Sequence, residues 1–153
     1  MNFSYHDAVA LAAAAHGEQV DHAGAPYIFH PLRVARALGD ELDRIVAVLH
    51  DVIEDTDVGA ADLLAAGVPP EAVVAVIALS HNPHEPRAHY LARVGANPRA
   101  VRVKRADMAD NCDPGRLGLL SAAKAAYYVA KYADAEAQLT QIAGPPPGPA
   151  DHP

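Results

Sequence analysis

Apolar and polar residues recur along this chain with the period of an α-helix. The clearest case follows Asp40, where apolar residues lie three and four positions apart: Leu42, Ile45, Val46, Leu49 and Ile53. At about 100° per residue, these side chains share one side of a helix, which we expect to run from Asp40 to residues 55–57. A stripe of this kind is typical of a helix that faces a hydrophobic core.

Similar patterns, bounded by capping residues, prolines and glycines, predict helices along most of the remaining chain. Their expected ranges are roughly 5–17, 31–39, 60–66, 70–79, 88–94, 97–111 and 119–142. No segment reads convincingly as a strand. We therefore expect an all-α protein, a compact helical bundle of about seven or eight helices.

The chain has 153 residues, enough for one domain with a hydrophobic core. Hydrophobic residues make up 51% of it but aromatic residues only 5%, which favours closely packed helices over a β-sandwich. We expect this domain to span residues 1–142. Residues 143–153 are rich in proline and glycine and predict a disordered tail.

The formal net charge is −7, which argues against indiscriminate binding to nucleic acid or to an anionic membrane. Cys112 is the single cysteine, so an intramolecular disulfide is excluded and a reducing compartment is favoured. The first residues lack the basic and apolar segments of a signal peptide, and no apolar run approaches the ~18 residues of a membrane span. These features predict a cytoplasmic protein.

Candidate chemistry lies on the polar side of the helix that follows Asp40. On a continuous helix, a sector of roughly 140° would carry one imidazole and three carboxylates: His50, Asp51, Glu54 and Asp55. Three carboxylates packed together repel one another, and such a group usually needs a cation or a shared proton. The loop 80–87 also contains histidines, but their spacing matches no helical metal site, and we expect an exposed loop.

Two other segments offer groups that could complete this site. Within 97–111, Lys104, Asp107 and Asn111 lie at positions i, i+3 and i+7 and share one helix face. His30 lies at a junction between a loop and a helix. His30, His50, Asp51 and Asp107 together make a mixed nitrogen and oxygen set, which suits Mn²⁺, Fe²⁺ or Zn²⁺ better than Ca²⁺. Four protein ligands leave positions for water and substrate, as in a catalytic metal site.

The order His30, His50-Asp51, Asp107 resembles the HD superfamily of metal-dependent phosphohydrolases. Three longer blocks are more specific: Ala-Gly-Ala-Pro-Tyr-Ile-Phe-His-Pro-Leu-Arg-Val at 23–34, Leu-His-Asp-Val-Ile-Glu-Asp-Thr at 49–56 and Val-Lys-Arg-Ala-Asp-Met-Ala-Asp-Asn at 103–111. In this order they resemble the hydrolase domain of RelA/SpoT proteins. The small stand-alone form, which lacks a synthetase domain, is the best match in length, and the similarity covers roughly residues 5–140.

The resemblance implies an activity and a set of roles. The reaction of the family is removal of the 3′-pyrophosphate from (p)ppGpp by attack of a metal-bound water, as part of the stringent response. One Mn²⁺, or another divalent transition metal, would be held by the matching residues His30, His50, Asp51 and Asp107. Glu54 and Asp55 would act in catalysis by activating water. Asn111 and Tyr132 would contact the nucleotide, and Lys104 would offset the charge that develops on the pyrophosphate.

Near Gly24 the chain departs from the family pattern. Where the long enzymes carry an Arg-Lys pair, with the Arg stacked on guanine, this sequence has Asp21 and His22, and Tyr128 replaces a second arginine. One alternative is therefore an HD phosphohydrolase that acts on another nucleotide, such as a nucleoside monophosphate or NADPH. Another is a catalytically silent nucleotide-binding module, which the intact ligand set disfavours. In each case the expected partner is a small nucleotide, and an oligomer is compatible with the sequence.

Overall fold

The fold was analysed in a computed structural model, which describes residues 2–148. These residues form ten helices and no strand: α1 (Tyr5–His16), α2 (Phe29–Arg36), α3 (Glu41–Leu49), α4 (Val52–Asp55), α5 (Ala60–Ala65), α6 (Pro70–Leu79), α7 (Arg87–Gly95), α8 (Pro98–Asn111), α9 (Pro114–Leu117) and α10 (Ala122–Ala143). The predicted all-α class is confirmed. The number of helices exceeds the prediction, partly because α4 and α9 are single turns of four residues.

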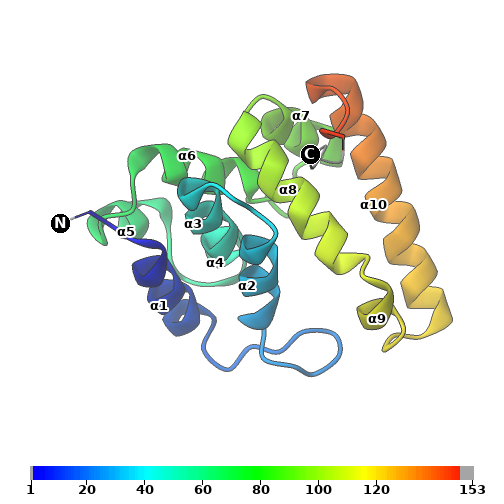
Figure 1. The fold of residues 1–153 in the computed structure, drawn as a ribbon, viewed down its shortest axis with the longest axis horizontal. Coiled ribbons are helices and arrows are strands. Elements are labelled where there is room, and N and C mark those ends of the chain that lie inside the picture. Colours follow the sequence, from blue (N-terminus) through cyan, green and yellow to red (C-terminus); the bar gives the residue numbers. More distant parts are fainter. Residues whose placement is uncertain (1, 149–153) are drawn as a thin grey trace, which may run out of the picture.

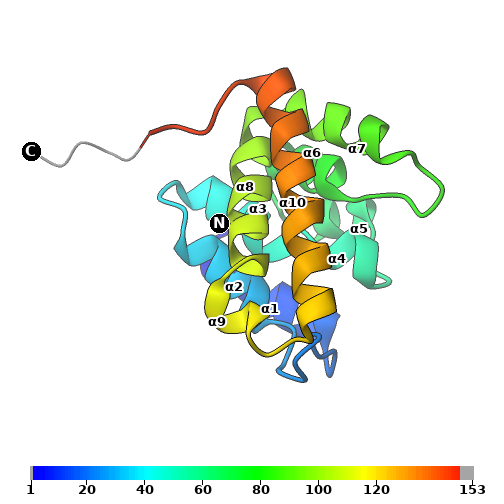
Figure 2. The same cartoon turned by 90° about the vertical axis from the view of Figure 1, so that its right-hand side faces the viewer.

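Helix α3 lies inside the bundle and packs against α1, α2, α6 and α8 (Figure 1). Helix α8 crosses the molecule and packs against α2, α3, α6, α7 and α10. The long α10 lies on the outside, beside α8 (Figure 2). Helices α3 and α8 therefore connect the N-terminal helices to the C-terminal part of the bundle.

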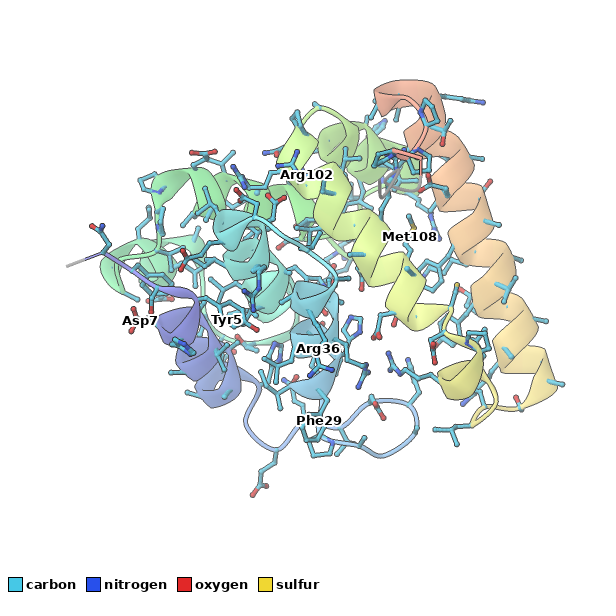
Figure 3. All side chains as sticks on the ribbon, viewed as in Figure 1. Tyr5, Asp7, Phe29, Arg36, Arg102 and Met108 are labelled. Carbon is cyan, nitrogen blue, oxygen red and sulfur yellow. The ribbon has the colours of Figure 1, made fainter. Side chains whose placement is uncertain are left out.

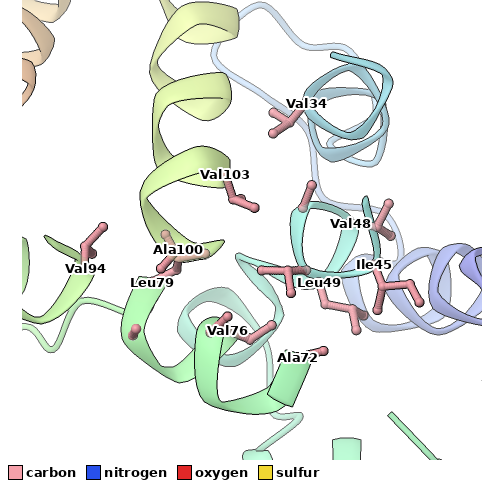
Figure 4. Close-up of a cluster of buried hydrophobic side chains, with 14 of the residues drawn as sticks. Val34, Ile45, Val48, Leu49, Ala72, Val76, Leu79, Val94, Ala100 and Val103 are labelled. Atoms are coloured by element: carbon pink, nitrogen blue, oxygen red, sulfur yellow. The ribbon is translucent and has the colours of Figure 1, made fainter. Parts of the chain in front are cut away.

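The hydrophobic core surrounds α3. Ile45, Val48 and Leu49 of this helix belong to the same buried cluster as Val76 of α6 and Val103 of α8, and each of these side chains is at least 98% buried (Figure 4). Full burial of an aliphatic side chain of this size contributes roughly 1.5–3 kcal/mol. The apolar stripe read from the sequence therefore does face the core.

A buried carboxylate ties α3 to α8. Asp43 is 2% exposed, and its oxygens accept hydrogen bonds from Arg99 and Arg102, both on α8. Arg102 extends from α8 toward the beginning of α3 (Figure 3). Because an unpaired buried charge is strongly destabilising, these contacts set how the two helices lie against each other.

The helix predicted to continue to residues 55–57 breaks at His50 and Asp51. Helix α3 ends at Leu49, and the separate turn α4 begins at Val52. The carbonyl of Ala47, which a continuous helix would pair with the N–H of Asp51, accepts from the backbone N–H and the ring Nδ1 of His50 instead. The prediction of one continuous helix was therefore wrong, and the acidic residues leave the axis of α3.

The other helix boundaries agree with the predictions to within a few residues. Ser4 and Asp7 form the expected capping box at the beginning of α1. The terminal helix begins at Ala122, three residues later than predicted, because the side chain of Ser121 accepts from the N–H of Lys124 and caps it. No helix in the described part of the chain is both long and apolar enough to cross a membrane.

The division into a domain at 1–142 and a tail at 143–153 stays a prediction. Ala143 still belongs to α10, and residues 144–148 have no regular secondary structure. The carbonyl of Gly144 accepts a hydrogen bond from Arg105. Residues 149–153 lie outside the described residues.

Helices α7 and α10 approach closely at Gly95, and this contact gives a prediction for stability. A Cβ atom at this position would overlap Cγ2 of Ile142 and lie 3.0 Å from its Cβ. At an open helical position, Gly→Ala is expected to stabilise a protein by about 1 kcal/mol. Here we expect Gly95→Ala to destabilise the protein by about 1–3 kcal/mol in urea denaturation, because the added methyl group overpacks the contact.

The double variant Gly95→Ala/Ile142→Ala removes the overlap and tests the cause. It should be more stable than Gly95→Ala alone, whereas Ile142→Ala by itself should have a small effect because Ile142 is 48% exposed. A Gly95→Ala protein that is as stable as the parent would contradict this description of the α7–α10 contact.

Candidate functional site

A cavity of about 690 Å³ opens beside the break between α3 and α4. Its walls come from the loop 19–27, from α4, from the loop after α6 and from α7, α8 and α10. The volume is in the range of small-molecule sites in proteins. Its lining is rich in charge of both signs, with five carboxylates and four cationic side chains: Asp21, Asp51, Glu54, Asp55, Asp107, Arg87, Lys104, Arg116 and Lys131.

His30 is buried and lines this cavity. It stands in the first turn of α2 and is 4% exposed. Its Nδ1 lies 2.7 Å from Oδ2 of Asp110, and its Nε2 lies 2.9 Å from Oδ1 of Asp107. Each nitrogen faces a carboxylate, which only accepts, so without a cation both nitrogens would donate; a cation bound at Nε2 would leave Nδ1 as the donor to Asp110.

His50 is oriented in the same way from the other side. Its Nδ1 donates to the carbonyl of Ala47 at 2.5 Å, which leaves the lone pair on Nε2. That nitrogen is buried and has no hydrogen-bond partner, yet it lies 3.0 Å from Oδ2 of Asp51 and 3.4 Å from Oδ1 of Asp107. An orphaned buried nitrogen that faces two carboxylates is costly unless a cation or a proton lies between them.

The four predicted metal ligands are thus brought together from α2, the α3–α4 break and α8. One ligand atom from each of His30, His50 and Asp107 can be chosen so that all lie within 4.8 Å of one another, and Asp51, Glu54 and Asp55 form a second such group. Asp51 contacts His50 and so joins the two groups. Two imidazole nitrogens and carboxylate oxygens that converge, with the remaining imidazole nitrogens tied elsewhere, could hold a divalent transition metal.

The electrostatics of the cluster favour a positive charge at its centre. Burial lowers the pKa of His30 and His50, but the neighbouring carboxylates outweigh it and raise both pKa values. Burial also works to raise the pKa of Asp107, but the Lys104 ammonium and the two imidazoles hold it well below its usual range. The carboxylate of Asp107 is therefore ionised and ready to bind a cation.

Glu54 and Asp55 project from α4 into the cavity. Although both residues are exposed overall, burial of the carboxyl groups raises the pKa of Glu54 and of Asp55, and the charge of Asp51 adds to both shifts. Oε1 of Glu54 accepts a hydrogen bond of 2.7 Å from the backbone N–H of His81. The loop 80–86 therefore forms part of the cavity, and the expectation that it would be merely exposed was incomplete.

Lys104 and Asn111 flank Asp107 on the face of α8 that the sequence predicted. Nζ of Lys104 lies 3.0 Å from Oδ2 of Asp107, and Nδ2 of Asn111 donates to Oδ1 at 3.1 Å. Both residues also line the cavity. Lys104 also lies over the rings of Tyr90 and Tyr132, at 5.6 and 6.0 Å from their centroids.

The third predicted substrate contact, Tyr132, lies in the wall formed by α10 and also lines the cavity. Tyr128 stacks on it with ring centroids 6.1 Å apart, and the hydroxyl of Tyr128 lies 3.0 Å from Nε2 of His22. Asp21, whose Oδ2 lies 3.6 Å from Arg116, completes this part of the rim. Arg116 thus brings a positive charge to the segment where the sequence showed only Asp21 and His22.

Several residues of the site were missed in the sequence. Tyr27 donates a hydrogen bond to Asp51, and Asp110 orients His30. Asp110 could have been found, because it lies three positions after Asp107 on α8. Arg87 and Lys131 also line the cavity, but they belong to helices distant in sequence and carry no local signal.

Comparison with known proteins adds partial sequence matches and one match over most of the fold. No protein-family model matches the chain. A guanosine-3′,5′-bis(diphosphate) 3′-pyrophosphohydrolase of Aquifex aeolicus is 49% identical over 51 residues, which are 31% of this chain and 7% of that protein. The protein of the same name from Vibrio cholerae is 47% identical over 57 residues, 35% of this chain and 8% of that protein. The chain thus covers less than a tenth of these relatives.

A solved structure described as a metazoan ortholog of SpoT that hydrolyses ppGpp superposes with a TM-score of 0.73. The superposition covers 90% of this chain and 86% of that one, at 21% sequence identity. The predicted resemblance is confirmed. At this identity the superposition establishes the helical HD-type fold, and the roles of individual residues rest on the geometry above.

Proposed function

We propose that this chain is a metal-dependent phosphohydrolase that removes the 3′-pyrophosphate from (p)ppGpp. The observation that carries the proposal is the convergence of two imidazole nitrogens with Asp51 and Asp107 at a cavity of about 690 Å³, which His30, Asp51 and Asp107 line. The names of the partial relatives and the activity of the SpoT ortholog indicate which phosphate ester to test first.

The proposed cofactor is Mn²⁺, held by His30, His50, Asp51 and Asp107. Mixed nitrogen and carboxylate ligands without thiolate suit Mn²⁺, Fe²⁺ and Zn²⁺, and Mn²⁺ is our choice among them from the resemblance to RelA/SpoT hydrolases. When bound, the metal supplies a Lewis acid that polarises a phosphoryl oxygen and lowers the pKa of water. Asp110 holds the ring of His30 in place through Nδ1, as carboxylates do behind metal-binding histidines.

Glu54 is the proposed base. Burial and the charge of Asp51 raise the pKa of Glu54, which makes it a better proton acceptor than an ordinary glutamate. The N–H of His81 fixes one of its oxygens, so the other oxygen is free to accept the proton. Asp55, beside it on α4, orients the same water in this proposal.

The bond changes follow from these assignments. The oxygen of water bonds to the phosphorus nearest the ribose, its proton passes to Glu54, and the bond from that phosphorus to the 3′-oxygen breaks. The 3′-oxygen takes a proton, and pyrophosphate is released. Lys104 offsets negative charge that develops on the phosphoryl oxygens, and Asn111 and Tyr132 contact the nucleotide.

We further propose that the protein acts on this small nucleotide in the cytoplasm, as part of the stringent response, and not on nucleic acid or at a membrane. The formal net charge of −7 supports this proposal, because the protein as a whole would repel a long polyanion. A single small phosphate ester can instead be compensated locally by the metal and a few cationic side chains.

A substrate screen tests the activity. Purified protein with Mn²⁺ should release pyrophosphate from ppGpp at a rate at least about 100-fold above that with nucleoside monophosphates or NADPH, measured as phosphate and pyrophosphate. If a nucleoside monophosphate or NADPH is turned over faster than ppGpp, that nucleotide becomes the assigned substrate. Nucleotide binding without turnover, seen as a shift in melting temperature, would instead indicate a silent binding module.

Removal of a ligand tests the metal site. With Mn²⁺ at about 100 times its dissociation constant, the parent should be stabilised by about 2.7 kcal/mol relative to the metal-free protein. His50→Ala should lose this stabilisation and the calorimetric binding of Mn²⁺. The exposed His84, which lies outside the cluster, provides a control, because His84→Ala should bind Mn²⁺ like the parent. Unchanged Mn²⁺ binding by His50→Ala would contradict the assigned site.

Removal of the base should separate binding from chemistry. Glu54→Gln keeps the size of the side chain but cannot take up a proton, so we expect kcat to fall by about 10²–10⁴-fold. Its Mn²⁺ affinity should stay within about threefold of the parent, because Glu54 is not among the proposed ligands. If this variant is as active as the parent, Glu54 has no part in the mechanism.

A further inference from the structure

The cationic side chains that line the cavity fall into two kinds. Lys104 is neutralised by Asp107, and Arg116 by Asp110. Arg87 and Lys131, in contrast, have no carboxylate oxygen within 4.0 Å among residues 2–148. Other cationic residues of helices α7, α8 and α9 do form ion pairs with carboxylates, namely Arg93, Lys104, Arg105 and Arg116. The cavity therefore contains two cationic side chains that have no ion-pair partner among residues 2–148.

The guanidinium of Arg87 reaches the helix that carries Lys131, and its charge acts on the Lys131 ammonium group. Nη2 of Arg87, in the first turn of α7, donates to the backbone carbonyl of Lys131 on α10 at 3.0 Å. Both side chains are partly buried, and both face the cavity. Burial and then the charges of Arg87 and Lys104 lower the pKa of Lys131. Like charges held together at a partly buried position are unfavourable unless an anion joins them.

Lys131 lies near the acidic residues of the proposed metal and base sites. Lys131 lies near enough to Glu54 and Asp107 for their charges to act on its ammonium group. The aromatic rim forms a smaller adjoining cavity of about 70 Å³, lined by His22, Tyr128 and neighbouring residues but not by Arg87 or Lys131. Because Nζ of Lys131 also lies 5.5 Å from the ring centroid of Tyr132, the cation pair lies beside the aromatic rim and within range of the charge of the proposed base.

We propose that Arg87 and Lys131 form an anion subsite for the distal phosphate of the substrate's pyrophosphate group. This inference rests on the proposed function and extends it. The attacked phosphorus lies at the metal cluster, and the distal phosphate stays bound to Arg87 and Lys131 as the pyrophosphate leaves. The subsite gives the protein a preference for pyrophosphate esters over phosphate monoesters, because a monoester leaves both cations without a partner.

Binding of inorganic anions tests the subsite without the nucleotide. With Mn²⁺ in excess over protein and anion, calorimetry should find that the parent binds pyrophosphate at least about tenfold more tightly than orthophosphate. Lys131→Gln and Arg87→Gln should each weaken pyrophosphate binding by about tenfold and change orthophosphate binding less than about twofold. Lys131→Arg keeps the charge and should retain most of the affinity.

Lys124 offers a matched control on the same helix. It is exposed and does not line the cavity, so Lys124→Gln removes one positive charge from α10 and should leave both anion affinities unchanged. Thermal denaturation of each variant checks that the fold is intact. In steady-state assays with ppGpp, Lys131→Gln should raise KM by about tenfold and keep kcat within about threefold, because the contact persists from substrate to transition state.

The outcomes separate the two proposals. Equal loss of pyrophosphate and orthophosphate binding in Lys131→Gln, or no loss of either, would overturn the subsite. If the parent prefers pyrophosphate and Lys131→Gln abolishes that preference, the subsite is supported even where ppGpp is not hydrolysed. In that case ppGpp is rejected as the substrate, and the subsite would serve another pyrophosphate ester.

Discussion

The arrangement of the molecule depends on the meeting of two imidazole nitrogens with two carboxylates in a buried position. His30 and His50 each use Nδ1 for a fixed hydrogen bond, and their Nε2 atoms approach Asp107 from two sides. Electron-pair donors held this close repel one another in a medium of low polarity unless a cation lies between them. The surrounding packing therefore has to hold them in place, and a divalent metal relieves the repulsion.

The core supplies that packing through α3. Five consecutive residues at the end of this helix, 45–49, are almost fully buried, so the position of His50 directly after them is set by the core. The break that follows turns the chain, and α4 presents Glu54 to the cavity while His50 stays buried. On one continuous helix, these groups would be confined to a single axis and could not surround one point.

Charge is unevenly distributed around the cavity. The break and α4 provide carboxylates, whereas α7, α8 and α10 provide Arg87, Lys104 and Lys131. A phosphate ester bridging a metal and a cationic wall would meet complementary charge on both sides. The fold, which resembles that of the SpoT ortholog, brings these walls together, and in this chain they carry Arg87 and Lys131.

The sequence by itself determined the helical class, the apolar stripe of α3, and the grouping of Lys104, Asp107 and Asn111 on one face of α8. Helical periodicity and capping are local properties, so neighbouring residues suffice to reveal them. Only the tertiary structure decided the break at His50 and Asp51, and the approach of Arg87 to Lys131. The break depends on competition for the carbonyl group of Ala47, and the approach of Arg87 to Lys131 depends on the packing of α7 against α10. The free energies of such contacts are set by the packed chain, so the spacing of residues in the sequence does not reveal them.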